Sequence, residues 1–564
     1  MKSITSQLAY FFQNRGTQKN IWQLSKFMII LIIVILVYTF LFHEIMAYEG
    51  EEYGWITGMY WTLVTMSTLG FGDITFQSTL GQVFSMIVLF SGILFLLVLL
   101  PFTFIQFFYA PWLEAQTQAR TPRKLPEGVN NHVIITKYDD IAQSLIGKLN
   151  KFNRPYVVLI DDLQRALELS DLGISVVLGA LDDPNTYKKL RVDSAAMVVA
   201  NNHDMINTNI AFTVRELSET VPIITTANSA EAVDILKLAG SNHVLNISET
   251  MGQTFGRRTL GGSARVHVIG RFDEMIISEA PAVGTPLVGK TILESRLREI
   301  TGMNVVGLWE RGDFELAKAD SVINDKTILV LVGSVDQMRS YDELFGIYHA
   351  TDAPVVIIGG GRVGRATAKS LKERQIKYKI IEKKTNLIRN TKNYVVGDAA
   401  DLMTLRKAGI NEAHTVIITT HDDDVNIYLT IYCRQLRPDI QITARTTLSR
   451  NLSTLHRAGA DFVMSYATMG ANAIFNLLKR GEVLMLAEGL DIFKTPVPNK
   501  LVGKKLYETN IREDTGCTVV ALSKKGEGME INPNPESELL PNENMVLIGT
   551  LEGEETFLKK YSNK

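Results

Sequence analysis

The sequence has few cysteines, no excess of either charge and no low-complexity composition. Its 2 cysteines, Cys433 and Cys517, are too few for a disulfide framework or a cysteine-based zinc site. The 58 Lys and Arg residues nearly balance the 60 Asp and Glu residues, so net charge gives no indication of nucleic-acid binding. A hydrophobic content of 46% excludes a disordered chain, and 41 Gly with 16 Pro exclude a collagen-like one. At roughly 150 residues per domain, the 564 residues predict about three or four folding units.

Basic residues are absent from one long segment. Residues 27–119 contain no Lys or Arg, although the whole chain averages about one basic residue in ten. Residues 27–42 and 83–110 are almost wholly apolar, and with the first run extended to 22–45 each reaches the ~20 residues that cross a bilayer. A cleaved signal peptide would resemble the first run, but no A-x-A-like cleavage site is present and a second apolar run follows. The sequence therefore predicts two membrane-spanning helices.

The charges around the two predicted spans set their orientation. Bases precede the first span and follow the second: Lys2, Arg15, Lys19, Lys26, Arg120, Arg123 and Lys124. Because basic flanks stay on the cytoplasmic side, both ends of the chain are predicted to be cytoplasmic in a multi-pass protein of the cell membrane. The segment between the spans carries no base, and its acids are Glu44, Glu49, Glu51, Glu52 and Asp73. An acidic outer face attracts cations.

A glycine-containing segment between the spans has the pattern of an ion pathway. A short helical stretch, residues 56–67, is directly followed by Thr68-Leu69-Gly70-Phe71-Gly72-Asp73. Glycines at alternate positions permit backbone conformations closed to residues with a Cβ, so successive carbonyls can point to one side. Four such segments around an axis would hold K⁺ at the carbonyls of Thr68, Leu69, Gly70 and Phe71, with the Thr68 hydroxyl extending the stack. The alternative is a re-entrant turn with two unrelated glycines.

The second span contains a candidate bending point. Gly92 lies inside it, and glycine lowers helix stability by ~1 kcal/mol relative to alanine, so Gly92 is a candidate gate hinge. A small residue that permits close helix packing is an equally good reading, and Pro101 could also supply a kink. No arginine-repeat helix is present, which excludes a voltage sensor.

The rest of the chain repeats itself at an offset of about 220 residues, which indicates two copies of one unit. The matching pairs of segments are 132–135 with 355–358, 156–161 with 377–382, 236–240 with 455–459, 287–290 with 501–504, and 301–306 with 515–520. In the larger part of each copy, aliphatic strands alternate with helical stretches, which is typical of a parallel α/β sheet. Each copy is therefore predicted to contain an α/β lobe and a small β-rich lobe.

The second copy carries a glycine-rich loop after its first predicted strand. The loop reads Gly359-Gly360-Gly361-Arg362-Val363-Gly364, a G-x-G-x-x-G that opens a helix. The first glycine permits the tight turn, the second lets a phosphate approach the backbone, and the third lets helix and strand pack closely. Further polar groups end later strands, where doubly wound sheets bind ligands: Glu382, Asp398 with Ala399, Thr419 and His421. The second copy is thus predicted to bind a nucleotide.

The acid at the end of the second strand indicates which nucleotide. Glu382 can accept hydrogen bonds from ribose hydroxyls, which favours NAD(H), ADP or ATP over NADP(H), although Lys383 and Lys384 beside it leave this open. The corresponding loop of the first copy, residues 136–141, contains none of the three glycines, so the first copy is expected to lack the phosphate cradle.

These motifs resemble those of a known family. Residues 68–73 resemble the potassium-channel filter T-V-G-Y-G-D, with Leu69 in place of Val and Phe71 in place of Tyr. The second change removes a hydroxyl that in the family ties the filter to pore-helix aromatics, here Tyr60 and Trp61. The repeated unit resembles the regulator of K⁺ conductance (RCK) domain. Together they resemble prokaryotic ligand-gated potassium channels with two RCK domains in tandem.

The resemblance implies a mechanism and an assembly. It implies a homotetramer in a lipid bilayer, with a ring of cytoplasmic RCK domains that pulls on the pore when it binds a nucleotide, and with Ca²⁺ as a further candidate ligand. Ligand binding can drive such gating only if the open and closed rings differ in affinity for the ligand. By the family pattern, Arg445 would approach the phosphates or a neighbouring domain. The resemblance implies neither a catalytic residue nor a nucleic-acid partner.

The predicted fold class is a two-helix pore with a re-entrant helix and filter, fused to two Rossmann-like RCK domains that each carry a small β-rich lobe. The expected boundaries are 1–113 for the pore, 114–128 for a linker, 129–250 and 251–340 for the first copy, and 352–480 and 481–564 for the second. A membrane-anchored NAD-dependent oxidoreductase and a regulatory component of a K⁺ uptake transporter are the alternatives. The first leaves residues 68–73 unexplained, and the second leaves the attached pore unexplained.

Overall fold

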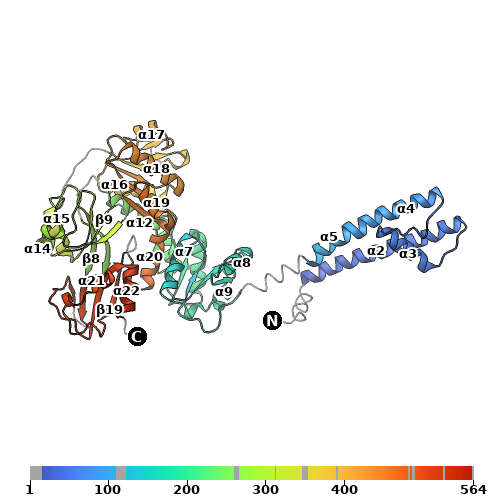
Figure 1. Ribbon diagram of the computed structural model, residues 1–564, viewed down its shortest axis with the longest axis horizontal. Coiled ribbons are helices and arrows are strands. Elements are labelled where there is room, and N and C mark those ends of the chain that lie inside the picture. The colour runs from blue at the N-terminus through green and yellow to red at the C-terminus, as the bar shows by residue number, and fades with distance from the viewer. Residues whose placement is uncertain are drawn as a thin grey trace. The chain divides into compact units, whose positions relative to one another are not determined.

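The computed structural model of the chain contains two compact units (Figure 1). One comprises Met1–Pro122 with Leu163–Ser170, and the other comprises Arg123–Asp162 with Asp171–Lys564. The structure describes residues 15–109, 122–259, 266–310, 313–345, 354–388, 392–479, 483–485, 490–524 and 528–561. Lys2 and Arg120, used for the predicted orientation, lie outside the described residues, as do positions 114–121 of the predicted linker.

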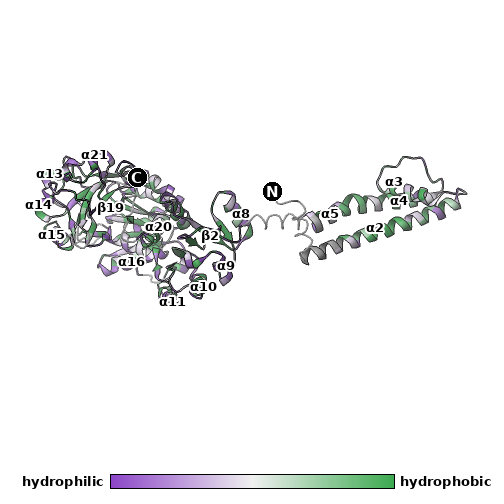
Figure 2. Ribbon diagram, turned by 90° about the horizontal axis from the view of Figure 1, so that it is seen from below, coloured by the Kyte–Doolittle hydropathy of each residue, from purple (hydrophilic) through white to green (hydrophobic). Residues whose placement is uncertain are grey.

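The first unit is built from two long apolar helices and a short one. Its elements are α2 (Arg15–Tyr48), α3 (Trp55–Met66), α4 (Thr79–Gly92), the π-helical η1 (Ile93–Leu99), α5 (Leu100–Phe104) and the π-helical η2 (Ile105–Tyr109). Two stretches, Leu24–Tyr48 and Thr79–Phe104, are long and apolar enough to cross a membrane. In Figure 2, green marks hydrophobic residues, and it runs along α2, α4 and α5.

Aromatic side chains form the core of this unit. Phe42 of α2, Trp61 of α3 and Phe84 of α4 are buried, together with Phe76 of the α3–α4 loop. The rings of Trp61 and Phe84 are stacked with centroids 5.8 Å apart, and those of Trp61 and Phe76 meet edge to face at 5.1 Å. Stacked and edge-to-face pairs are the favourable arrangements of aromatic rings. Trp61 also contacts Phe42 of α2, with ring centroids 5.0 Å apart, so this residue links the short helix α3 to both long helices.

The larger lobe of the first copy is a six-stranded parallel sheet in the order β3-β2-β1-β4-β5-β6. Its strands are β1 (Val133–Ile135), β2 (Tyr156–Ile160), β3 (Val176–Leu178), β4 (Met197–Ala200), β5 (Ile223–Thr226) and β6 (His243–Leu245). The helices along this part of the chain are α7 (Asp140–Lys151), α8 (Leu163–Asp171), α9 (Pro184–Lys189), η3 (Val192–Ser194), α10 (Asp204–Arg215), α11 (Ala232–Leu238) and α12 (Ile247–Arg257). The central strands are short aliphatic runs because helices cover both faces of such a sheet.

The second copy repeats this sheet in the order β14-β13-β12-β15-β16-β17. Its strands are β12 (Val355–Ile358), β13 (Tyr378–Glu382), β14 (Tyr394–Val396), β15 (Thr415–Ile418), β16 (Gln441–Thr446) and β17 (Phe462–Ser465). Its helices are α16 (Arg362–Glu373), η4 (Thr385–Leu387), α17 (Leu402–Lys407), α18 (Asp423–Leu436), η5 (Ser449–Asn451), α19 (Leu452–Arg457) and α20 (Tyr466–Leu478). The strand order is that of the Rossmann fold, whose switch point lies between the first and fourth strands, here β12 and β15.

Each copy ends in a five-stranded antiparallel sheet, in the orders β10-β9-β11-β8-β7 and β18-β19-β22-β20-β21. The small lobe of the first copy contains the strands β7 (His267–Phe272), β8 (Met275–Pro281), β9 (Asn304–Glu310), β10 (Asp313–Leu316) and β11 (Ile328–Gly333). Its helices are α13 (Ile292–Ser295), α14 (Leu297–Thr301) and α15 (Val335–Phe345). The small lobe of the second copy contains the strands β18 (Val483–Met485), β19 (Leu490–Pro496), β20 (Thr518–Lys524), β21 (Met529–Ile531) and β22 (Glu543–Thr550). Its helices are η7 (Leu506–Glu508), α21 (Ile511–Thr515) and α22 (Leu551–Tyr561). One hydrophobic core includes buried residues of both sheets, among them Ile277 and Ile492. The two small lobes therefore pack as a pair.

Glycines allow the larger lobes of the two copies to pack closely along α12 and α16. A Cβ on Gly252 of α12 would overlap the Cβ of Ala366, and one on Gly256 would lie 2.5 Å from the Ser370 hydroxyl. The two larger lobes also meet at Phe152 after α7, which contacts Phe475 of α20 with ring centroids 4.9 Å apart. The expected boundary at residues 250–251 lies within α12, the helix that makes this seam.

Gly252→Ala is expected to lower the free energy of unfolding of the protein by about 1–3 kcal/mol, because the added methyl group overpacks the seam. The matched control is Gly147→Ala on α7, where no atom lies within 4 Å of the added Cβ and helix propensity favours alanine by about 1 kcal/mol. Urea unfolding of the two purified variants checks both effects. Equal stability changes in the two variants would contradict the close seam.

A buried acid pair lies in the second small lobe. Glu554 of α22 and Asp491 of β19 are each only 4% exposed, and Glu554 Oε2 has no hydrogen-bond partner among the residues that the structure describes. Burial raises the pKa of Glu554 to about 7, with further contributions from Asp491 and Glu555. Burial raises the pKa of Asp491 to about 6, although Lys148 of the first copy opposes this shift. Both carboxyl groups therefore keep their protons to a higher pH in the folded protein than in an unfolded chain.

The pair predicts a pH dependence of stability. Because the pKa of Glu554 in the folded protein is about 7 and its ordinary value is 4.5, the folded protein loses stability as pH rises through this window, by roughly 3 kcal/mol at most. Glu554→Gln is expected to remove that part of the slope in unfolding experiments between about pH 5 and pH 8. Glu552→Gln, at an exposed position of the same helix, is the control and should leave the slope unchanged. The same slope in both variants would contradict the assignment.

Candidate functional site

The segment predicted to be a selectivity filter has an alternating backbone. The φ angles of Thr68, Gly70 and Gly72 are 63°, 49° and 74°, whereas Leu69 and Phe71 between them have no positive φ. Alternation between left-handed and ordinary conformations turns successive carbonyls toward the same side of the chain. The sequence pattern indicated this conformation for the two glycines. It did not indicate it for Thr68, because a β-branched residue rarely adopts a positive φ.

The pore-helix aromatics fix the chain that follows this segment. Tyr60 Oη donates a hydrogen bond to the Asp73 carboxylate at 3.2 Å, and Trp61 Nε1 donates to the Ile74 carbonyl at 3.1 Å. The sequence suggested that Tyr60 and Trp61 would face the position of Phe71. Their polar atoms bond instead to the two residues after Gly72, so these ties do not depend on a hydroxyl at position 71.

Glu49 at the end of α2 holds the start of the second long helix. Its carboxylate accepts hydrogen bonds from the backbone N–H groups of Gln77 and Ser78, each at 2.9 Å, and from the Ser78 hydroxyl. Ser78 is also the N-cap of α4, where its hydroxyl accepts from the N–H of Gly81. One predicted outer acid is therefore engaged in fixing the loop rather than free to attract ions.

Gly92 lies in close packing against the end of α3. Its φ and ψ are −60° and −47°, ordinary helical values, and a Cβ would overlap backbone atoms of Met66. This geometry supports the close-packing reading of Gly92. The π-helical turn η1 begins at the next residue, Ile93, and a π-helix is a locally widened helix that often marks functional positions. The role of Gly92 as a gate hinge stays a prediction.

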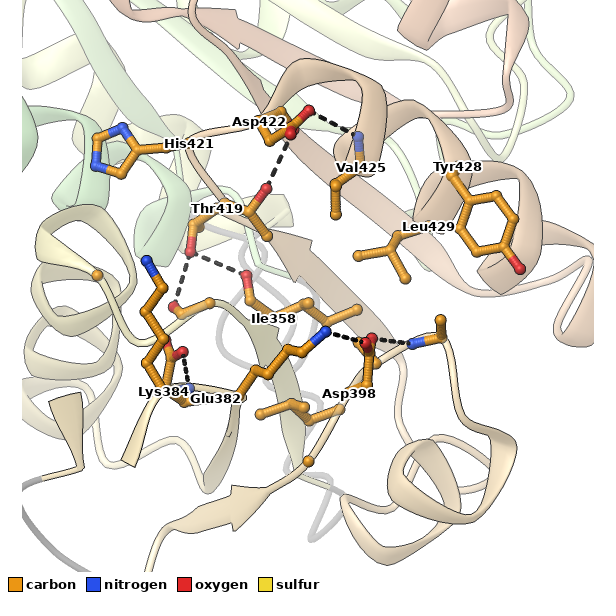
Figure 3. A pocket seen from close by; sticks show the side chains of 18 of the residues that line it. Ile358, Glu382, Lys384, Asp398, Thr419, His421, Asp422, Val425, Tyr428 and Leu429 are labelled. Carbon is orange, nitrogen blue, oxygen red and sulfur yellow. Dashed lines mark hydrogen bonds and ion pairs between the residues drawn. The ribbon is translucent and has the colours of Figure 1, made fainter. Parts of the chain in front are cut away.

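In the second unit, a cavity of about 660 Å³ opens at the carboxyl ends of the strands of the second copy (Figure 3). This volume falls within the range of small-molecule and cofactor sites. The residues that line it are Ile358, Gly359, Gly361, Ile381, Glu382, Lys383, Lys384, Leu387, Gly397, Asp398, Ala399, Ala400, Thr419, Thr420, His421, Asp422, Asp424, Val425, Tyr428 and Leu429. Seven of the predicted nucleotide-binding residues are among them: Gly359, Gly361, Glu382, Asp398, Ala399, Thr419 and His421.

The three glycines of the loop have three different geometries. Gly359 has a φ of 102°, which makes the tight turn after β12. A Cβ on Gly364 would overlap the carbonyl oxygen of Gly359, so this glycine allows helix α16 to approach the strand. Gly361 is the N-cap of α16, and no atom of the described residues lies within 4 Å of the place that its Cβ would occupy. The space in front of Gly361 is thus open to a ligand at a helix N-terminus, where phosphates bind.

Glu382 holds the loop as well as facing the cavity. One carboxylate oxygen accepts the N–H of Gly360 at 2.6 Å, and the other accepts the N–H of Lys384 at 2.7 Å. The residue is 8% exposed. Each carboxylate oxygen can accept more than one hydrogen bond, so acceptor capacity remains for ribose hydroxyls.

An ion pair spans one wall of the cavity. Lys383 Nζ lies 2.8 Å from Asp398 Oδ2, and Asp398 also accepts the N–H of Ala400. The hydrogen bond from Lys383 holds the pKa of Asp398 below its usual value, and the bond from Ala400 adds to this shift. Lys383 is therefore neutralised by Asp398, whereas Lys384 extends toward Thr419 in Figure 3.

Thr419 and His421 follow β15. The Thr419 hydroxyl lies 3.1 Å from the Ile358 carbonyl and 3.0 Å from the Gly359 carbonyl, so it ties β15 to the turn of the glycine loop. Partial burial lowers the pKa of His421, and the positive charges of Arg445, Arg362 and Lys384 lower it further. Burial and the surrounding positive charges thus both favour the neutral imidazole.

The remaining predicted residues do not line the cavity. Val363 is 1% exposed and belongs to the hydrophobic core, and Gly364 serves helix packing. Arg362 donates to the Asn228 side chain of the first copy. Arg445 is 3% exposed and lies over the Tyr466 ring at 5.0 Å, and its Nε has no hydrogen-bond partner within the described part of the chain.

Some lining residues were not singled out from the sequence. One wall is formed by Val425, Tyr428 and Leu429 of α18, with Leu387 after β13. Their i, i+3, i+4 spacing marks one face of a helix, but the sequence does not show that this face meets the cavity rather than the core. Asp422 caps α18 and accepts the N–H groups of residues 424 and 425, as expected for acids at a helix start.

The equivalent position of the first copy is filled by its own side chains. Asn202 donates to the Thr136 hydroxyl at 2.8 Å, and Asn201 donates to the Asp139 carboxylate at 2.9 Å and to the Lys137 carbonyl. Asp139 in turn caps α7. This network lies at the strand ends where the second copy has its glycine loop, in line with the expected loss of the phosphate cradle.

Comparison with known proteins identifies the family. The ion channel family model matches residues 29–109, the TrkA-N domain model matches 133–247 and 355–466, and the TrkA-C domain model matches 277–346 and 492–562. The structure titled "GsuK channel bound to NAD" is 36% identical with a TM-score of 0.59, and the match covers 97% of this chain and 100% of that one. The chain therefore belongs to the family of potassium channels that carry RCK domains.

Curated relatives agree with this assignment. Potassium channel protein 1 of Methanocaldococcus jannaschii is 23% identical over 319 residues, which cover 54% of this chain and 94% of that protein. The calcium-gated potassium channel TvoK of Thermoplasma volcanium is 26% identical over 250 residues, which cover 42% of this chain and 69% of that protein. The resemblance and the fold class predicted from the sequence are confirmed, and the protein is a potassium channel of the membrane.

Proposed function

We propose that this channel conducts K⁺ through the segment Thr68–Gly72 and that an adenine nucleotide, NAD(H) or ADP/ATP, controls it by binding in the second copy. The observation that carries the proposal is the cavity at the carboxyl ends of the second sheet, with open space in front of Gly361 at the N-terminus of α16. The similar GsuK channel has been solved with NAD bound. A phosphate placed at Gly361 would meet backbone N–H groups and the positive end of the helix dipole.

The cavity suits an unphosphorylated adenosine ribose. Glu382 offers carboxylate oxygens at the end of β13, and the charge of Lys383 is already neutralised by Asp398. A 2′-phosphate would need a cation at this place and would be repelled by Glu382. The apolar wall of Val425, Tyr428 and Leu429 offers a surface for the base.

The proposed assembly is a homotetramer with both termini in the cytoplasm. A single chain supplies one of the four filter segments, so a K⁺ pathway needs four copies. Exposed apolar side chains support association of the cytoplasmic units: Met205 and Phe212 of α10 are 84% and 57% exposed, and Tyr428 and Ile431 of α18 are 56% and 51% exposed. Contiguous exposed apolar surface marks interaction sites.

The nucleotide acts in this proposal as a regulatory ligand and not as a redox cofactor. The curated and structural relatives described above are potassium channels, and an oxidoreductase would leave the Thr68–Gly72 segment unexplained. Calcium as a second ligand stays a prediction. Within the described ranges, no group of three or more His, Cys, Asp or Glu side chains is placed to hold a metal ion.

Flux from purified protein in liposomes tests the proposal. We expect K⁺ efflux that exceeds Na⁺ efflux, and a change in K⁺ flux when NAD⁺, NADH or ADP is added on the cytoplasmic side. Loss of K⁺ selectivity would contradict the pore assignment. Indifference to NAD(H), ADP and ATP alike would contradict the ligand assignment, and turnover of NADH with a substrate would favour the oxidoreductase alternative.

A further inference from the structure

Glu49 directly follows α2 and binds the chain that connects the filter segment to α4. One carboxylate oxygen accepts the N–H of Gln77 at 2.9 Å. The other accepts the N–H of Ser78 at 2.9 Å and also the Ser78 hydroxyl. The bond from the Gln77 N–H, and after it the bond from the Ser78 hydroxyl, lower the pKa of Glu49. The carboxylate is therefore ionised at neutral pH and acts only as an acceptor.

The chain after the filter segment is held at several successive positions. Tyr60 and Trp61 of α3 bond to residues 73 and 74. The ring of Phe76 is buried and meets the Trp61 ring edge to face, and a Cβ on Gly81 of α4 would overlap the Phe76 side chain. Glu49 holds the last two positions, residues 77 and 78. Residues 73–78 thus form a connector between the filter segment and α4, and Glu49 fixes its far end.

The filter segment, Thr68–Gly72, lies between this connector and α3. On the α3 side, the N–H groups of Thr68 and Leu69 donate to carbonyls of α3, each at 3.1 Å. On the connector side the segment contains Gly70 and Gly72, both with positive φ. Glycine passes readily between left-handed and ordinary conformations, so a shift of the connector can be absorbed by turning a glycine peptide. Such a turn would move a carbonyl away from the ion pathway.

We propose that Glu49 is a positioning residue for K⁺ conduction, which keeps the connector where the carbonyls of Thr68–Gly72 face the ion pathway. This inference rests on the conduction through that segment proposed above. Because K⁺ binds the aligned carbonyls and not the turned ones, K⁺ and Glu49 stabilise the same arrangement. A filter that lacks the hydrogen bonds of Glu49 therefore needs a higher K⁺ concentration to remain conducting.

Two substitutions of Glu49 separate its position from its charge. Glu49→Asp keeps the charge, but its side chain is one methylene group shorter, so its oxygens withdraw from the two N–H groups. Glu49→Gln keeps the length, but its amide NH₂ would face an N–H donor. The matched control is Glu51→Gln, which removes the same charge from an exposed position close by.

Recordings from the purified full-length channel in planar lipid bilayers test the inference. At low K⁺ on both sides, both Glu49 variants are expected to carry about tenfold less current than the wild type, because each subunit loses hydrogen bonds to a charged group. At high K⁺ they should recover most of the wild-type current. Glu51→Gln should stay within about twofold of the wild type at both concentrations, since an exposed charge is screened by salt. A residue that only attracts cations would give a normal Glu49→Asp and two equally impaired Gln variants.

Each result decides for or against the inference. Wild-type currents from Glu49→Asp at low K⁺ would overturn it and leave conduction through the filter intact, and so would equal impairment of Glu49→Gln and Glu51→Gln. If size-exclusion chromatography shows that neither Glu49 variant assembles, Ser78→Ala decides, because it removes one donor and keeps Glu49. A smaller loss at low K⁺ with the same recovery is then expected, and wild-type currents would overturn the inference. A wild-type channel without K⁺ selectivity would overturn the proposed function itself.

Discussion

Gly70→Ala is expected to abolish K⁺ conduction while leaving the protein folded and assembled. Gly70 has a φ of 49°, in the left-handed region that costs a residue with a Cβ about 1–2 kcal/mol. In a tetramer the cost arises four times, about 4–8 kcal/mol in total, and it is relieved when each peptide turns to an ordinary conformation. Turning the peptide moves a carbonyl away from the ion pathway, so the alternation that Thr68, Gly70 and Gly72 share is lost.

A control in the same unit separates this effect from general damage. Gly54, the N-cap of α3, has a φ of −71°, and an added Cβ would lie 3.9 Å from the Thr57 hydroxyl, an ordinary contact. Gly54→Ala should therefore keep normal K⁺ flux in liposomes. Both variants should migrate as tetramers in size-exclusion chromatography. Normal K⁺-selective flux from Gly70→Ala would refute the assignment of residues 68–72 as the filter.

The sequence predicted the backbone conformation of the filter better than it predicted the hydrogen bonds that hold the chain next to the filter. Alternate glycines restrict the backbone locally, so Gly70 and Gly72 indicated their own left-handed conformations. The hydrogen bonds of Tyr60 to Asp73 and of Trp61 to Ile74 span 13 residues, and no local pattern fixes which later residue each aromatic reaches. The sequence placed these aromatics near the position of Phe71 only by family resemblance.

The nucleotide site shows the same division between local and long-range information. Gly359, Gly361 and Gly364 could be assigned different roles from their spacing because each role is set within one strand–turn–helix unit. Arg362 and Arg445 were predicted to serve the ligand, but neither lines the cavity. Arg362 bonds to a residue 134 positions away in the first copy, and that packing is decided by the whole fold. Residues that act across the seam between the copies could not be found from the sequence alone.

Gly361→Asp is expected to abolish the nucleotide response and to leave K⁺ selectivity unchanged. Gly361 has φ −66° and ψ −169°, which any residue adopts, and no atom would lie within 4 Å of an added Cβ. Aspartate is a good N-cap and should stabilise α16 slightly relative to glycine, by roughly a few tenths of a kcal/mol, so the variant should fold. Its carboxylate would stand where a phosphate must bind. At about 4 Å and an effective dielectric constant of about 20, the repulsion is about 4 kcal/mol, or roughly a thousandfold in affinity.

The neutral variant Gly361→Ala shows whether charge or bulk is responsible. It adds the same Cβ without the carboxylate, so NAD⁺ affinity should fall much less than in Gly361→Asp. Calorimetry with NAD⁺ gives the affinities, and liposome flux with and without NAD⁺ gives the response of the channel. If Gly361→Asp keeps its response to NAD⁺, the nucleotide phosphates do not bind at this helix N-terminus. If both variants lose binding equally, bulk rather than charge excludes the ligand, and the backbone of the glycine loop must then approach the phosphate closely enough to exclude even a methyl group.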